Sequence, residues 1–171
     1  MNLVLQKWKE NLYLKKTSKK VTTFDDWLKN FWESMINFME KNEWVGLAAP
    51  QVGYNIRVIT VTNWQKIWND LKLTNNIVMV NPEILEYSWK KEKDYEWCLS
   101  LPGIKVEVER SLNIQVRYQD LEGNYITDKL SWLNARIVQH EVDHLDWVLI
   151  TDYKKSSDKK ISLDLSKFTN V

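Results

Sequence analysis

The sequence has little glycine or proline and a single cysteine. Four glycines and three prolines occur in 171 residues, against ten tryptophans. Glycine normally makes up about 7% of a protein, so the usual order of glycine and tryptophan is reversed. Because Cys98 is the only cysteine, an internal disulfide is excluded. A lone cysteine is a small buried apolar side chain, a nucleophile or a metal ligand.

The chain also lacks an excess of either charge and any long apolar run. It has 24 basic and 23 acidic side chains, for a formal net charge of +1. That balance gives no reason to expect nucleic acid or an acidic membrane as a partner. No run approaches the ~20 apolar residues of a membrane helix. Residues 1–16 carry too many charges and too short an apolar stretch for a signal peptide. We therefore expect a cytoplasmic protein.

The pattern of apolar residues predicts an α+β protein. With 44% hydrophobic residues and no repeat or linker, residues 1–171 suit a single domain, with a charged tail from about residue 154. Residues 24–41 have helical apolar spacing, and Thr22 or Thr23 is a candidate cap. A second helix is expected from about Leu133 to Asp146. Short β-type runs lie between the helices, at 56–61, 77–82, 105–109, 113–119 and 125–130.

The sharpest motif is QHEVDHL at residues 139–145. His140 and His144 are four residues apart, so on a helix both imidazoles project from one face and can bind one metal ion. Glu141 follows the first histidine and lies close enough to move the proton of a metal-activated water. These are the only two histidines in the chain. The pattern therefore indicates a catalytic metal site rather than two incidental histidines on a solvated helix.

Three segments resemble the signature motifs of the peptide deformylases, in the same order along the chain. They are GLAAPQVG at 46–53, EWCLSLPG at 96–103 and QHEVDHLDWVL at 139–149. The resemblance implies an α+β fold in which mixed or antiparallel sheets surround a central helix with the HExxH motif, and a long N-terminal helix comes first. It also implies a metal-dependent hydrolase that removes the N-formyl group from formyl-Met nascent peptides and releases formate.

The resemblance implies which residues hold the metal. Cys98, His140 and His144 match the family's ligands, and Glu141 matches its general acid/base. A thiolate ligand suits ferrous iron as well as zinc. Family members often work best with iron, so we expect one divalent ion, Fe(II) in the cell, with Zn(II) and Ni(II) as alternatives.

Further roles follow from the same motifs. The side-chain amide of Gln51 and the backbone N–H of Leu99 match groups that stabilise the oxyanion formed as water attacks the formyl carbon. Gly46 lies where the family's backbone pairs with an extended peptide. The residues expected to bind the substrate are Gly46, Leu47, Trp97 and Ile137. The ribosome, near its exit tunnel, is a candidate partner for the lysine-containing tail, although the acids in the tail favour a solvated surface.

Tryptophan stands at four positions where the deformylase family usually has glycine. These are Trp44, Trp97, Trp132 and Trp147. Glycine serves there for positive φ after a helix or for close packing beside a metal, and tryptophan is a poor substitute. One hypothesis is that the source reads UGA codons as glycine, whereas this sequence has them translated as tryptophan. The other is genuine divergence, and the codons at these positions distinguish the two.

Two other functions are consistent with the same residues. HExxH also occurs in zinc peptidases, but these take their third ligand from a downstream His or Glu, and no histidine follows His144. A second alternative is a catalytically weakened protein of the same fold that only binds peptides, with Trp97 filling the groove. Because every expected catalytic residue is present, we favour the enzyme.

Overall fold

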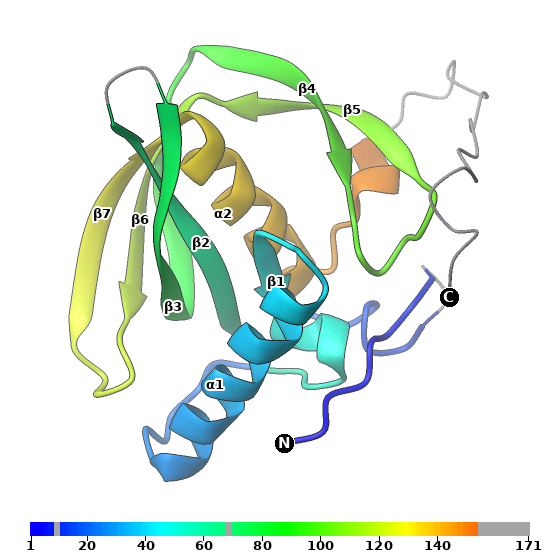
Figure 1. Cartoon of the computed structure of the whole chain (residues 1–171), viewed down its shortest axis with the longest axis vertical. Helices are drawn as coiled ribbons and strands as arrows, with labels where there is room; N and C mark the ends of the chain where they lie inside the picture. Colours follow the sequence, from blue (N-terminus) through cyan, green and yellow to red (C-terminus); the bar gives the residue numbers. More distant parts are fainter. Residues whose placement is uncertain (9–10, 68–69, 154–171) are drawn as a thin grey trace.

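Figure 1 shows the computed structural model, which describes residues 1–8, 11–67 and 70–153. The described residues form two α-helices, two short 3-10 helices and seven strands. In chain order they are α1 (Asp26–Lys41), β1 (Gly46–Ala48), η1 (Ala49–Val52), β2 (Val58–Ile67), β3 (Asp70–Tyr87), β4 (Lys91–Trp97), β5 (Lys105–Ser111), β6 (Asn113–Gln119), β7 (Tyr125–Ser131), α2 (Trp132–Leu145) and η2 (Ile150–Tyr153). The predicted α+β class is confirmed. The expected tail lies outside the described residues.

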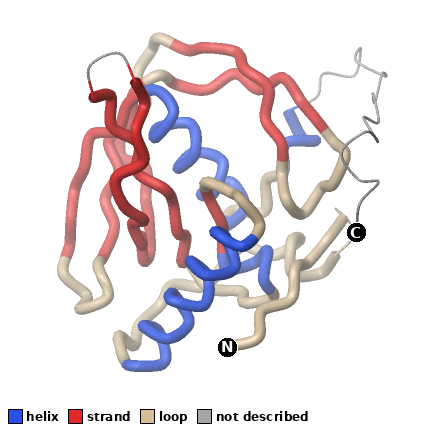
Figure 2. Tube along the Cα trace, viewed as in Figure 1, coloured by secondary structure: helices blue, strands red, loops and turns tan. Residues whose placement is uncertain are grey.

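The strands form two antiparallel sheets with α2 between them (Figures 1 and 2). One sheet has the order β1-β2-β3-β6-β7, so β1 is an edge strand. The other is the β4–β5 hairpin. Buried apolar residues of α2, among them Ala135, Val138 and Leu145, pack with sheet residues such as Ile59 and Val116. Both sheets therefore face the helix that carries the histidine motif.

Helix α1 forms where its apolar spacing predicts, but its cap differs from the expectation. The Asp25 side chain accepts a 3.0 Å hydrogen bond from the backbone N–H of Leu28, so Asp25 caps the helix rather than Thr22 or Thr23. A carboxylate at this position also interacts favourably with the positive end of the helix dipole. The buried residues of α1 are Leu28, Phe31, Met35 and Met39.

Most of β4 and the outer halves of β2 and β3 were not expected from the sequence. In β4 every side chain is exposed except that of Glu96, so the strand has no apolar alternation to predict it. The pairing of β2 with β3 continues past Asn63 and Asn75, and asparagine is disfavoured in strands. Pairing with the neighbouring strand, rather than local sequence preference, makes these segments strands.

Neither α1 nor α2, the two described α-helices, has the length and apolar character of a membrane span.

The cap of α1 can be tested by substitution at Asp25. We expect Asp25→Ala to lower the free energy of unfolding by about 1 kcal/mol, because the N–H of Leu28 loses its acceptor. Asp25→Asn should retain most of the stability, since asparagine also caps well. Urea unfolding of the three proteins measures the difference, and equal losses for alanine and asparagine would contradict this role.

Candidate metal centre and active site

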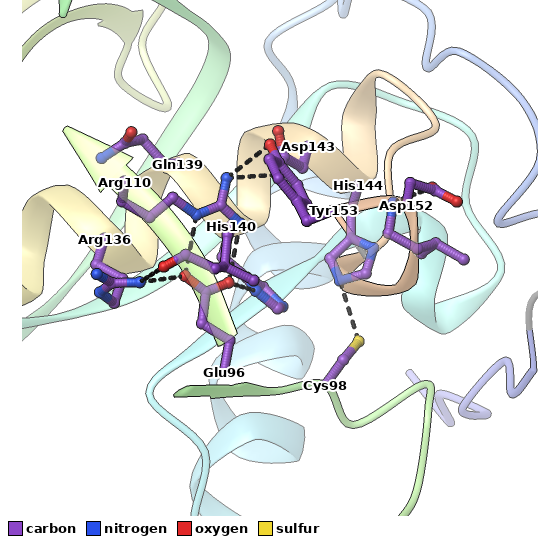
Figure 3. Close-up of polar contacts among 12 residues, drawn as sticks. Glu96, Cys98, Arg110, Arg136, Gln139, His140, Asp143, His144, Asp152 and Tyr153 are labelled. Atoms are coloured by element: carbon purple, nitrogen blue, oxygen red, sulfur yellow. Dashed lines mark hydrogen bonds and ion pairs between the residues drawn. The ribbon is translucent and has the colours of Figure 1, made fainter. Parts of the chain in front are cut away.

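Cys98, His140 and His144 come together although they lie on two different elements. Cys98 directly follows β4, whereas both histidines lie on one face of α2. One ligand atom of each residue lies within 4.8 Å of the other two. Cys98 Sγ lies 3.2 Å from His144 Nε2, and both residues are almost completely buried (Figure 3).

The donor atoms of this group fit a divalent transition metal. One thiolate and two imidazoles provide three ligands, which leaves a fourth position of a tetrahedral site open. His140 uses Nδ1 to contact Glu96, so its Nε2 is the nitrogen free to bind an ion. Glu141 Oε2 is buried beside the group and has no hydrogen-bond partner among the described residues. A buried polar atom of this kind requires a partner such as water or substrate.

A buried ionic network contacts His140 at its Nδ1 nitrogen (Figure 3). Glu96 Oε2 lies 3.0 Å from His140 Nδ1. Arg110 donates to both carboxylate oxygens of Glu96, each at 2.9 Å, and Arg136 donates to Oε1 at 2.8 Å. Arg110 also bonds Asp143 at 2.6 Å. Metal-binding histidines in proteins usually have such a partner, which fixes the ring orientation.

The pKa values of two buried carboxyl groups at the site are shifted in opposite directions. Burial alone would raise the pKa of Glu96, but hydrogen bonds from Arg110 and His140 lower it to about 2. Burial raises the pKa of Glu141 to about 7, despite the nearby His140. Glu96 is therefore a permanent carboxylate at neutral pH. Glu141 can both accept and release a proton near pH 7, which suits a general acid/base.

The two histidines also differ from each other. Burial alone would lower the pKa of His140, but contacts with the Cys98 sulfur and the Glu96 carboxylate raise it well above its ordinary value. Burial and the neighbouring His140 lower the pKa of His144. His144 therefore favours the neutral form, which is the form that binds a metal ion.

Gln51 lies against the ligand group from the other side. It is buried in η1, and its Oε1 accepts a 2.8 Å hydrogen bond from the backbone N–H of Ala48. This bond directs the amide NH₂ toward Cys98, where Nε2 lies 3.7 Å from Sγ. Leu99 follows Cys98 in the chain, so its backbone N–H is next to the same ligand. The Gln51 amide on η1 and the Leu99 backbone after β4 thus bring two N–H donors from separate segments to Cys98.

Gly46 passes so close to Glu141 that no side chain fits there. A Cβ at position 46 would collide with the Glu141 carboxylate and would lie 2.9 Å from Ile137 Cγ2. Gly46 is in edge strand β1, which leaves one side of its backbone open to an extended peptide. The requirement for glycine therefore comes from the positions of the Glu141 carboxylate and the Ile137 side chain.

The remaining expected substrate residues occupy different environments. Leu47 is fully buried in the core against α1, so only its backbone is available at the sheet edge. Ile137 is buried on α2, and its side chain lies next to the backbone of Gly46. Trp97 is half exposed at the end of β4, and Lys105 Nζ lies 4.6 Å from its ring centroid. Sequence reasoning missed the network of Glu96, Arg110 and Arg136. Only Glu96 had a signal, as a charged residue inside the cysteine motif.

Comparison with known proteins agrees with this arrangement. A family model described as polypeptide deformylase matches residues 4–160. A peptide deformylase of Dictyoglomus thermophilum is 46% identical over 139 residues, which cover 81% of this chain and 84% of that protein. One of Thermotoga neapolitana is 42% identical over 160 residues, covering 90% and 91%. The chain belongs to the peptide deformylase family.

Solved deformylase structures have the same fold. The Thermotoga maritima peptide deformylase gives a TM-score of 0.80 at 39% identity, covering 91% of this chain and 99% of that one. A Met-Ala-Ser-bound class I type b peptide deformylase from Acinetobacter baumannii gives 0.83 at 35% identity, covering 90% and 99%. The resemblance, the fold and the hydrolase activity predicted from the three motifs are confirmed. The roles of individual residues stay predictions.

The contact between Gly46 and Glu141 gives a direct test. We expect Gly46→Ala to lower kcat about 100-fold, because a displacement of about 1 Å at a catalytic group has effects of that size. Metal content should stay unchanged, since Gly46 is not among the grouped ligand atoms. Steady-state kinetics and metal analysis of the purified variant check this. Unchanged kcat would show that Glu141 tolerates displacement.

Proposed function

We propose that Glu141, together with a divalent ion held by Cys98, His140 and His144, hydrolyses the formamide bond of N-terminal formylmethionine in nascent polypeptides. The observation that carries this proposal is the convergence of three ligand atoms within 4.8 Å of one another, beside the buried Glu141 carboxylate, whose Oε2 has no hydrogen-bond partner in the part of the chain that the structure describes. The products are formate and a peptide with a free N-terminal amine.

The side chains divide the reaction between them. When bound, a divalent ion supplies Lewis acidity and acidifies water in its open position. Glu141, with a pKa of about 7, takes a proton from the water that attacks the formyl carbon. It returns the proton to the amine nitrogen as the C–N bond breaks. Gln51 Nε2 and the N–H of Leu99 donate hydrogen bonds to the oxygen that becomes negative.

The substrate is positioned by backbone as much as by side chains. An extended peptide adds to the open edge of β1 at Gly46, as peptides do at other exposed sheet edges. Leu47 contributes through its backbone, and the apolar Ile137 lies under the same edge. Trp97 is half exposed and precedes Cys98 in the chain, and we assign it to the same substrate site. The Met-Ala-Ser-bound structure of a relative supports a peptide that begins with methionine as the ligand.

Fe(II) is the ion we propose in the cell, with Zn(II) and Ni(II) as functional alternatives. The soft thiolate of Cys98 and two imidazoles bind all three ions well. We also propose that the protein acts in the cytoplasm, because its substrates are nascent peptides. Ribosome association would involve the tail, which lies outside the described residues.

The alternative functions have weaker support. A zinc peptidase would use a downstream His or Glu, whereas here a thiolate completes the group. A protein that only binds peptides would have no use for a buried carboxylate whose pKa is raised to about 7.

Formate release from a formyl-Met peptide tests the function. The protein should be loaded with Fe(II) or Ni(II) without oxygen, with and without Trp97→Gly. We expect Glu141→Gln to lower kcat by about 10²–10⁴-fold while the bound metal is retained. Glu83→Gln, an exposed residue paired with Arg117, is the matched control and should have full activity.

Each outcome has a distinct meaning. Activity only in Trp97→Gly would show that the indole blocks the groove. Metal-loaded protein without activity in either version would contradict the proposed function. Equal activity of Glu141→Gln and the unsubstituted chain would remove Glu141 from its role.

A further inference from the structure

Arg136 joins the two elements that carry the ligands. It lies one helical turn before His140 on α2. Its Nη1 donates to Glu96 Oε1 at 2.8 Å and to the carbonyl of Val108 at 3.1 Å, and its Nη2 donates to the carbonyl of Glu92 at 2.8 Å. One guanidinium on α2 thus contacts both strands of the β4–β5 hairpin.

These contacts differ in kind from those of Arg110. Arg110 binds side chains, namely the carboxylates of Glu96 and Asp143. Arg136 binds the backbone of the hairpin as well, so it fixes where β4 lies relative to α2. Cys98 follows β4 and His140 is on α2, so this placement determines the separation of the thiolate from the imidazoles.

We propose that Arg136 is a positioning residue that fixes the distance between Cys98 and the two histidines, and thereby the affinity for the metal ion. This proposal rests on the proposed function of the same site. A planar guanidinium can satisfy three acceptors in fixed directions, whereas an ammonium on a flexible stem cannot hold them equally well. Arg136→Lys should therefore be intermediate between the unsubstituted chain and Arg136→Met.

Cobalt binding tests this without relying on activity. We expect Arg136→Met to weaken Co(II) affinity about 10–100-fold and to shift the thiolate-to-cobalt absorption band, with partial rescue by lysine. Arg117→Met is the control, because Arg117 is half exposed and pairs with Glu83 on the five-stranded sheet. A lower Tm with an unchanged cobalt spectrum and affinity would overturn the proposal. Failure of the unsubstituted chain to bind cobalt would instead overturn the proposed metal site.

A separate observation concerns the backbone at three tryptophans. Among the described residues, five other than glycine have positive φ, and three of these are Trp8, Trp132 and Trp147. Their φ values are 70°, 54° and 61°. The left-handed region is disfavoured for any bulky L-residue and is the usual place of glycine. The other two residues are Glu43 and Asn81, and asparagine is tolerated there.

The exposure of these tryptophans shows little packing to offset the strain. Trp8, Trp132 and Trp147 are 49%, 66% and 53% exposed, so about half or more of each residue packs against no described part of the chain. Trp147 follows Asp146, the C-cap of α2, and the N–H of Val148 donates to the carbonyl of Asp143 at 2.8 Å. That bond defines a Schellman motif with Trp147 at the position that glycine usually fills.

We infer that the natural protein has glycine at positions 8, 132 and 147, encoded by UGA codons that its source reads as glycine. At positions 132 and 147 the deformylase family usually has glycine. For position 8, the only support is the positive φ of its backbone. Trp27 is a contrasting case, because it lies within helix α1 and stacks on Phe31 with ring centroids 5.2 Å apart. Trp27 therefore has the surroundings of a true tryptophan.

The gene and thermal unfolding test this inference independently. We expect TGA at codons 8, 132 and 147, and glycine-containing peptides in mass spectra of protein isolated from the source. Trp132→Gly and Trp147→Gly should each raise the Tm by about 2–4 °C, whereas Trp27→Gly should lower it. TGG at the three codons would overturn the inference that UGA is read as glycine at these positions. Loss of stability in both variants, as in Trp27→Gly, would overturn the backbone argument.

Discussion

The carboxylate of Glu96 links the β4–β5 hairpin to helix α2, and the ligand group depends on that link. Glu96 lies on β4, two residues before Cys98, and it contacts His140 and Arg136 on the helix. A buried charge is costly unless it is fully paired. Arg110 of the same hairpin, and Arg136 and His140 of the helix, surround it, so loss of either helix residue would leave a buried carboxylate with fewer partners. This network therefore joins residues that are distant in the sequence.

The same packing explains the environment of Glu141. The helix is covered by the five-stranded sheet on one side and the hairpin on the other, so Glu141 is buried and its pKa is raised to about 7. β1 lies close enough that only glycine fits at position 46. An edge strand beside a buried carboxylate is the arrangement that the proposed function requires, since the strand can pair with an extended peptide and the carboxylate can move a proton. The α+β arrangement therefore brings the proposed binding edge and the proposed acid/base together.

The tryptophans show where sequence and backbone disagree. A native sequence usually agrees with its fold at each level, from local propensity to packing. At Trp132 and Trp147, an exposed indole occupies a left-handed backbone at either end of the helix that carries the ligands. Glycine at these positions would restore agreement without changing any ligand.

The sequence by itself determined the three motifs, and with them the family, the fold class and the expected ligands Cys98, His140 and His144. It could do so because HExxH spacing on a helix is local, and because short motifs carry their chemistry in adjacent residues. Only the tertiary structure decided which residues support that chemistry. Arg110 and Arg136 have no local signal. Arg110 meets Glu96 through the pairing of β5 with β4, whereas Arg136 meets it only because the hairpin folds onto α2. β4 likewise could not be predicted from the sequence. Its residues are mostly polar and exposed, so the strand forms because it pairs with β5 rather than because of its own sequence pattern.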